Sequence, residues 1–60
     1  MINKVWCVFQ LDKSSHKTSL MSVFGDNQKA VDRVAYYSSE AKKEGNALRY
    51  FYFIEMRYVQ

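Results

Sequence analysis

The feature that most constrains the fold is the aromatic-rich segment 48–59 (LRYFYFIEMRYV), which contains neither Gly nor Pro. Tyr, Phe, Ile and Val favour the pleated, half-buried geometry of a β-strand. With the period of two that a strand imposes, one face of this segment is apolar throughout, and the other is apolar in its middle and charged at its ends. A strand that is apolar on both faces needs cover on both faces, or it presents a binding surface.

The length of 60 residues predicts one domain that spans residues 1–60. A domain of this size buries only about 60% of its unfolded surface, so we expect marginal stability. The single cysteine, Cys7, cannot form an internal disulfide, and no His and Cys cluster has the spacing of a structural zinc site. Dense aromatic packing or oligomerisation is therefore expected to supply the missing stability.

The N-terminal sequence MINKVWCVFQLDK has no long uncharged apolar core and no small-residue cleavage site, so we predict neither a signal peptide nor a transmembrane span. A lone cysteine is typical of a reducing compartment. We therefore expect a cytoplasmic protein without a membrane partner. The net charge of +3 comes from scattered Lys and Arg residues, which permit nucleic-acid binding but do not form the concentrated basic face that usually supports it.

Two strands and a turn are predicted in the first part of the chain. Residues 3–11 alternate with the period of a strand, and residues 17–24 form a second, more polar strand that suits a sheet edge. The polar residues 12–16 between them are a normal length for a hairpin connection.

A helix is predicted over residues 27–44. Gly25 ends the second strand, Asp26 is a good N-cap, and Gly45 is the usual residue for a left-handed C-cap. The apolar stripe on one face of this helix consists of small and medium residues: Ala30, Val34, Tyr37 and Ala41.

The order of these elements predicts an α+β fold of the β-β-α-β type. The helix carries the chain back across the sheet, so the last strand pairs antiparallel with the first, giving a three-stranded antiparallel sheet of order 3-1-2 with one helix on one face. Pairing beside the second strand is the alternative, and it leaves the more apolar first strand at an edge.

One helix covers one face of such a sheet, and the other face is expected to expose aromatic residues. The expected open face contains Trp6, Val8, Met21, Val23, Phe51 and Phe53. If the helix covers that face instead, the open residues are Phe9, Tyr50, Tyr52, Met56 and Tyr58. An apolar centre with a charged rim is typical of a protein–protein interface. The candidate partner-binding residues are Trp6, Val8, Met21, Val23, Arg49, Phe51, Phe53 and Arg57.

Three kinds of cover for this face remain open: a different protein, a second copy of the chain in a homodimer, or the chain's own loops. A fourth possibility is single-stranded nucleic acid, because the run Arg49–Phe53 resembles the aromatic strands on which RNA-binding sheets stack bases. The glycines of the RNA-binding signature are missing from this chain, and the chain has only half of the secondary structure that such RNA-binding domains usually contain.

The candidates for chemistry are isolated residues. Cys7 lies in mid-strand among apolar neighbours, which indicates a buried thiol rather than a nucleophile. His16 and Asp12 resemble half of a catalytic dyad, but no nucleophile is placed beside them. There is no metal-ligand spacing and no glycine-rich phosphate loop. We therefore predict a protein that is not an enzyme, with no catalytic residue, no metal site and no cofactor.

The segments VWCVFQLD, SLMSVFGDNQKAVDRV and YFYFIEMRYV together resemble a loose class of very small β-β-α-β proteins of bacteriophages and related bacterial genomes. The resemblance implies a phage-type accessory protein in the host cytoplasm that binds and modulates or inhibits a host protein, for example a defence enzyme or an anti-CRISPR-type target. It transfers no catalytic residue. The basic charge of this chain departs from the acidic inhibitors that mimic nucleic acid, and so disfavours a DNA-mimic mechanism.

Overall fold

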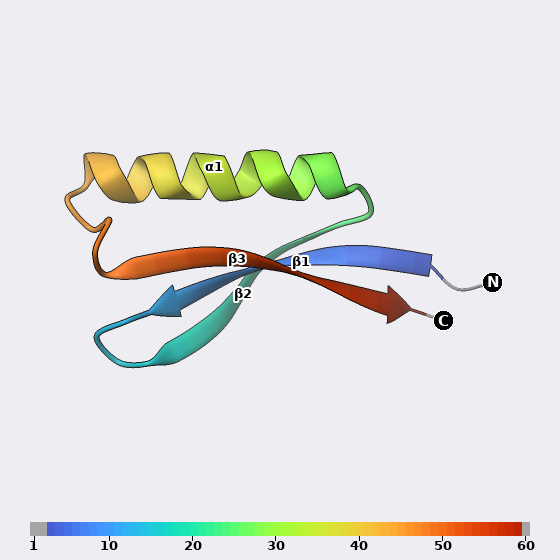
Figure 1. Cartoon of the computed structure of the whole chain (residues 1–60), viewed down its shortest axis with the longest axis horizontal. Helices are drawn as coiled ribbons and strands as arrows, with labels where there is room; N and C mark the ends of the chain where they lie inside the picture. The colour runs from blue at the N-terminus through green and yellow to red at the C-terminus, as the bar shows by residue number, and fades with distance from the viewer. Residues whose placement is uncertain (1–2, 60) are drawn as a thin grey trace.

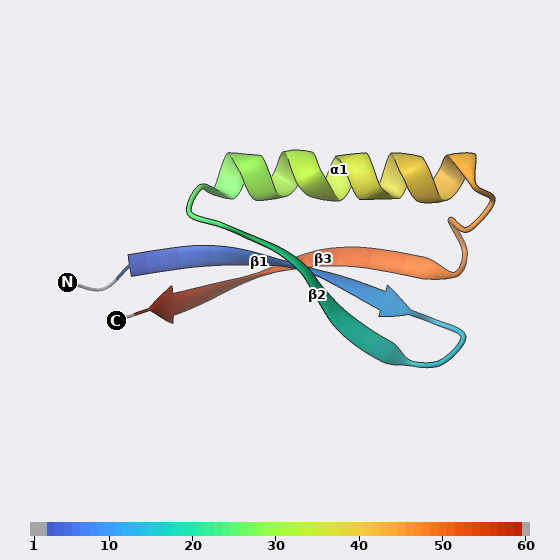
Figure 2. The same cartoon turned by 180° about the vertical axis from the view of Figure 1, so that it is seen from behind.

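The computed structural model describes residues 3–59, which form a three-stranded antiparallel sheet with one helix (Figures 1 and 2). The elements, in chain order, are β1 (Asn3–Asp12), β2 (Lys17–Phe24), α1 (Asn27–Lys43) and β3 (Tyr50–Val59). The sheet order is β2-β1-β3, which is the predicted order 3-1-2 read from the other edge. The predicted α+β fold is confirmed.

The first hairpin contains a tight turn and a bulge. Asp12 holds the turn, because its Oδ1 accepts hydrogen bonds from the backbone N–H of Ser14 at 3.0 Å and from its hydroxyl at 2.8 Å. The register of β1 and β2 shifts between Val8 and Phe9, so that Met21 is an extra residue in β2. Beyond this bulge, every residue of β2 has moved to the opposite face from the one that simple alternation predicts.

Both ends of α1 are capped by the residues that the sequence indicates. The Asp26 carboxylate accepts from the backbone N–H of Gln28 at 2.9 Å. At the other end, Asn46 N–H donates to the Ala41 carbonyl at 2.7 Å and Gly45 N–H donates to the Lys42 carbonyl at 3.2 Å. This is the Schellman pattern, and it requires the positive φ of 76° that Gly45 adopts.

The start of β3 differs from the prediction by two residues. The backbone N–H groups of Arg49 and Tyr50 both donate to the Asn46 carbonyl, at 3.0 and 3.1 Å, so the chain is still turning at these positions. The strand therefore begins at Tyr50 rather than Leu48, and Leu48 is 90% exposed in the turn. From Tyr50 onward, β3 pairs with β1 over its whole length.

The helix lies on one side of the sheet in both views (Figures 1 and 2) and contacts all three strands. Ala30 and Ala41 are buried on the predicted stripe, and Tyr37 between them stacks on Tyr52 of β3 with ring centroids 5.3 Å apart. The Tyr37 hydroxyl also hydrogen-bonds to Ser22 of β2 at 3.0 Å. The aromatic ring and hydroxyl of one residue thus join the helix to both edge strands.

The fold is thin and its core is small. The molecule measures 43 × 22 × 10 Å, and its radius of gyration is 12.4 Å, against about 10 Å for a compact chain of this length. Its accessible surface is 4514 Å², whereas a compact monomer of 7.1 kDa is expected to expose about 4,100 Å². Within residues 3–59, the buried hydrophobic residues are Cys7, Val8, Ala30 and Ala41.

Candidate functional site

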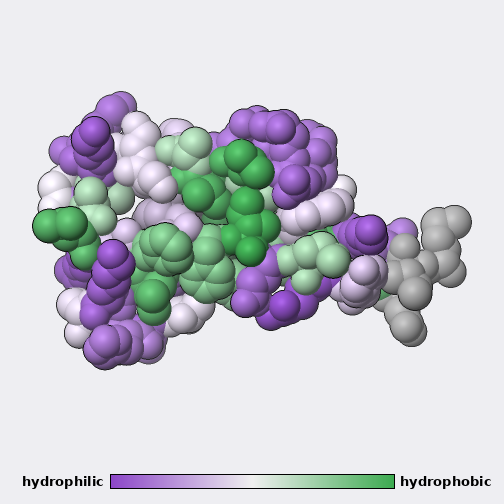
Figure 3. All heavy atoms as spheres, viewed as in Figure 1, coloured by the Kyte–Doolittle hydropathy of each residue, from purple (hydrophilic) through white to green (hydrophobic). Residues whose placement is uncertain are grey.

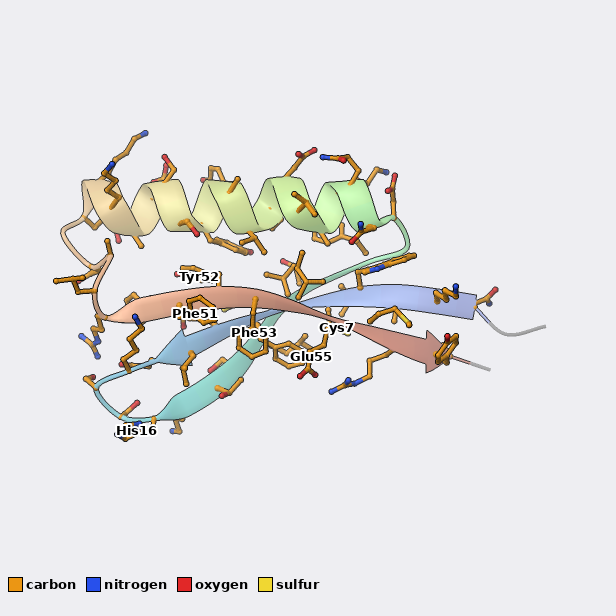
Figure 4. All side chains as sticks on the ribbon, in the orientation of Figure 1. Cys7, His16, Phe51, Tyr52, Phe53 and Glu55 are labelled. Atoms are coloured by element: carbon orange, nitrogen blue, oxygen red, sulfur yellow. The ribbon has the colours of Figure 1, made fainter. Side chains whose placement is uncertain are left out.

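The alternation of β3 places its side chains on two opposite faces of the sheet. Tyr52 stacks on the helix, so its neighbour Phe53 points to the face that the helix leaves open. Figure 4 shows this directly, with Tyr52 between β3 and α1 and Phe53 on the far side of the ribbon. Phe9 is the register partner of Phe53, and Leu11 is that of Phe51, so all four share the open face.

The second edge strand extends this apolar surface. Leu20 of β2 lies opposite Phe9, and Val23 lies opposite Cys7 on the same face. Leu20 is 57% exposed, and Val23 and Phe51 are each 51% exposed. Figure 3 shows hydrophobic residues across the centre of the view, from the helix at the top to the strands below it. The residues that the register places on the face away from the helix form what we call the open-face patch, which consists of Phe9, Leu11, Leu20, Val23, Phe51 and Phe53.

Three phenylalanine rings form a ladder within the open-face patch. Phe9 and Phe53 stack with centroids 5.3 Å apart, and Phe53 and Phe51 follow at 6.0 Å with a similar tilt. The ammonium of Lys13 lies 5.9 Å from the centroid of the Phe51 ring. Such ring pairs contribute about 0.5–1.5 kcal/mol each beyond the area that they bury. The ladder is therefore held in place by its own stacking, without cover from the helix.

An ion pair between Arg49 and Asp12 joins the start of β3 to the end of β1, beside the hairpin turn. Arg49 donates from Nε to Asp12 Oδ1 at 3.3 Å and from Nη2 to Asp12 Oδ2 at 3.1 Å. The hydrogen bond from Arg49, with help from Ser14, holds the pKa of Asp12 well below its usual range, and the same pair raises the pKa of Arg49. The side chain of Asp12 is only 18% exposed, against 52% for Arg49. The guanidinium predicted to meet a partner is thus already neutralised by a carboxylate.

The opposite end of β3 carries a second ion pair, between Glu55 and Arg57. Both residues lie on the same face as the open-face patch, because they follow Phe53 at intervals of two along the strand. Figure 4 shows Glu55 on the same side of β3 as Phe53. The apolar centre therefore has a matched ion pair on its own face at the end where Arg57 lies. At the hairpin end, Asp12 is the register partner of Tyr50 and belongs to the helix side, where the Arg49 guanidinium lies 5.2 Å from the centroid of the Tyr50 ring. Lys13 is the cation that lies over the Phe51 ring of the patch.

Two of the predicted partner-binding residues lie on the wrong face. Val8 is fully buried and Trp6 is half-buried. Their register partners in β3 are Ile54 and Met56, which lie two and four residues after Tyr52 and therefore share its face, the helix side. The prediction grouped even-numbered residues of the first strand with odd-numbered residues of the last. The register instead pairs even with even and odd with odd, so each of the two alternative faces mixed residues from both sides.

The remaining predicted residues are placed as follows. Val23, Phe51 and Phe53 lie on the open face as predicted, while Met21 is 39% exposed at the bulge. Arg49 and Arg57 stand at the two ends and are engaged in ion pairs. The list of candidate residues omitted Phe9, which stood only in the alternative open face. It also omitted three further residues that belong to the patch or lie against it: Leu11, Lys13 and Leu20.

The residues considered for chemistry stand apart from one another. Cys7 is buried in the central strand, as predicted, whereas His16 is exposed in the hairpin turn with a positive φ of 57°. Asp12 is engaged by Arg49 and Ser14 rather than by the histidine. Within the described residues, no three His, Cys, Asp or Glu side chains gather in a way that would hold a metal ion. The one helix of this part of the chain is neither long nor apolar enough to cross a membrane.

Comparisons with models of known protein families, with curated proteins and with solved structures found no match to this chain.

Proposed function

We propose that this chain is a non-enzymatic interaction module that binds a protein partner through the open-face patch. The observation that carries the proposal is the ladder of Phe9, Phe53 and Phe51, which is stacked and yet left uncovered by the helix. Rigid, partly exposed aromatic rings are the side chains that contribute most binding energy at protein interfaces. They lose little conformational entropy on binding when stacking already fixes them.

The composition of the surface favours a protein over other partners. An apolar aromatic centre with the ion pair Glu55–Arg57 and the cation Lys13 at its border matches the hydrophobic core and polar rim of a protein interface. The resemblance to bacteriophage β-β-α-β proteins supports a host protein as that partner, with modulation or inhibition of its activity as the result.

Single-stranded nucleic acid is the second candidate, and one observation favours it. Phe9 and the two phenylalanines of β3 stand on adjacent strands with Lys13 beside them, which is an arrangement on which unpaired bases can stack. The charge argues against it, because both arginines near the patch are paired with carboxylates. Backbone phosphates supply much of the affinity for nucleic acid, and little free positive charge is left here to bind them.

Affinity capture from a bacterial host lysate, with and without nuclease, tests the proposal. The wild-type chain should retain a defined protein in a nuclease-resistant manner, and Phe51→Ser should lose it. Tyr58→Ser is the matched control, because Tyr58 is an aromatic residue of the same strand that is 61% exposed and lies on the other face. Capture that Phe51→Ser leaves intact, or that nuclease abolishes, contradicts a protein partner at this surface.

Sedimentation velocity on the same variants separates a host protein from a second copy of the chain. The proposal predicts that the isolated wild-type protein and Phe51→Ser sediment alike at low micromolar concentration. A stable homodimer that Phe51→Ser dissociates, with no other protein captured, would make self-association the function of the patch instead.

A further inference from the structure

A second surface lies on the helix side of the sheet, away from the open-face patch. It is a groove of about 470 Å³ between the end of β2 and the first half of α1. Its lining residues are Phe24, Lys29, Asp32, Arg33 and Tyr36. Phe24 is the register partner of Trp6, and Trp6 lies two residues before the buried Val8, so all three are on the helix side of the sheet. The groove and the patch are therefore on opposite sides of β1 and β2.

Arg33 is held in the groove by aromatic rings. The central carbon of its guanidinium lies 5.8 Å from the centroid of Phe24, 5.5 Å from that of Tyr36 and 5.8 Å from that of Tyr37. At these distances the three rings attract the guanidinium as a cation. Such contacts leave the N–H donors of Arg33 available to a ligand.

Within residues 3–59, neither cation of the groove makes an ion pair, although the carboxylate of Asp32 lines the same groove. The ion pairs of this part of the chain join other residues, so neither Arg33 nor Lys29, one helical turn before it, is neutralised. Asp32 accepts a hydrogen bond from Gln28 Nε2 at 3.0 Å through one oxygen. The groove thus offers a fixed guanidinium, an ammonium, a carboxylate and exposed aromatic surface, since Tyr36 is 54% exposed.

We propose that this groove binds a nucleoside monophosphate. The phosphate meets Arg33 and Lys29, because a guanidinium recognises phosphate oxygens through paired N–H donors. The planar base stacks on the exposed ring of Tyr36, and Asp32 accepts from a hydroxyl or amino group of the ligand. The groove is open to solvent, and its volume of about 470 Å³ exceeds what a lone phosphate fills. This site is independent of the protein-binding patch.

Titration of the full chain with AMP, adenosine and inorganic phosphate at low salt tests the assignment. Calorimetry gives the affinities, and the fluorescence of Trp6, which neighbours Phe24 across the β1–β2 ladder, gives a second readout. AMP should bind saturably, and adenosine and phosphate should each bind about tenfold or more weakly, because each makes only half of the contacts. Equal binding of AMP and adenosine, equal binding of AMP and phosphate, or no saturable binding of AMP at millimolar concentration would each overturn the proposal.

Variants of the two cations locate the site. Arg33→Gln should weaken AMP binding about tenfold or more, and Arg33→Lys should restore only part of the loss because lysine lacks the flat fork. Lys43→Gln is the matched control, since it removes a cation from the same helix outside the groove. Circular dichroism confirms that each variant is folded. Losses of AMP affinity that are equal in Arg33→Gln and Lys43→Gln would show nonspecific attraction by net charge and would contradict the site.

Discussion

Phe9 of β1 and Phe53 of β3 stand directly opposite each other in the sheet register, and their rings stack 5.3 Å apart on the face away from the helix. Phe51 continues the stack one pleat further along β3. Rings that usually form the core of a small domain are here left at its surface, while the helix covers the opposite face, where Val8 is fully buried. This division of the sheet into a covered and an open face leads to the first two of four predictions on the folded protein, and an ion pair and a helix cap lead to the other two.

The face assignment is tested by two substitutions of the same chemical type. Val8→Ala should lower the free energy of unfolding by about 2 kcal/mol or more, because it leaves a cavity under the helix at a fully buried position. Val23→Ala removes the same atoms from a half-exposed position of the open face and should cost less than about 1 kcal/mol. Urea denaturation followed by circular dichroism measures both. Equal losses would mean that the two valines are equally buried and that the faces are wrongly assigned.

The aromatic ladder should contribute less to stability than its size suggests. Phe51→Ala removes a ring that is 51% exposed, and we expect a loss of about 1 kcal/mol, well below the 3–5 kcal/mol of a buried phenylalanine. The measurement is a thermal or urea unfolding curve compared with that of Tyr58→Ala. A loss of 3 kcal/mol or more, on the scale of a buried ring, would show that Phe51 belongs to a core within the single chain.

The Asp12–Arg49 pair predicts a loss of stability in acid. Its hydrogen bonds place the pKa of Asp12 in the folded state below its ordinary value of 3.8. The stabilisation is therefore fully present above that ordinary value and is lost as the pH falls through the lower pKa of the folded state. Urea midpoints between about pH 2 and 6 should fall more steeply for the wild type than for Asp12→Asn.

Salt gives the control for this pH effect. Arg49 is 52% exposed, so the pair is accessible to ions and its contribution should be reduced at high salt. The difference between the acid limbs of wild type and Asp12→Asn should therefore narrow at 1 M NaCl. Parallel pH profiles of the two proteins at low salt would contradict the role assigned to the pair.

The helix cap at Gly45 should be sensitive to a side chain for conformational reasons alone. A Cβ at this position would meet no atom within 4 Å, but the φ of 76° is one that other residues rarely adopt. Gly45→Ala should thus cost about 1 kcal/mol. Gly25→Ala is the control, since Gly25 has open space around it and no positive φ. Similar unfolding free energies for Gly45→Ala and the wild type would contradict the Schellman cap.

Local signals in the sequence predicted the elements well, because caps and periodicity act within a few residues. Asp26 and Gly45 placed the ends of the helix to within a residue, and the apolar stripe identified Ala30 and Ala41 as its buried side. The strand order followed from the same reasoning, since a helix crossing back over a hairpin favours antiparallel pairing with the first strand.

The composition of the open face could not be predicted, because it depends on register. A shift of one residue moves a whole strand to the other face, and nothing local in the sequence sets the pairing of Phe9 with Phe53. The bulge at Met21 also reverses the alternation within β2, and for this reason Leu20 and Val23 share the open face. Trp6 and Val8 were misplaced for this reason. The uncovered face contains the predicted Val23, Phe51 and Phe53 together with Phe9, Leu11 and Leu20.

Photo-crosslinking from the patch tests the central claim most directly. A benzophenone amino acid in place of Phe51, expressed in a bacterial host and irradiated, should form a covalent adduct with a defined host protein. The same group in place of Tyr58, on the same strand but the other face, should form none. Adducts from both positions alike, or no adduct from position 51, would contradict a protein-binding role for the open face of the sheet.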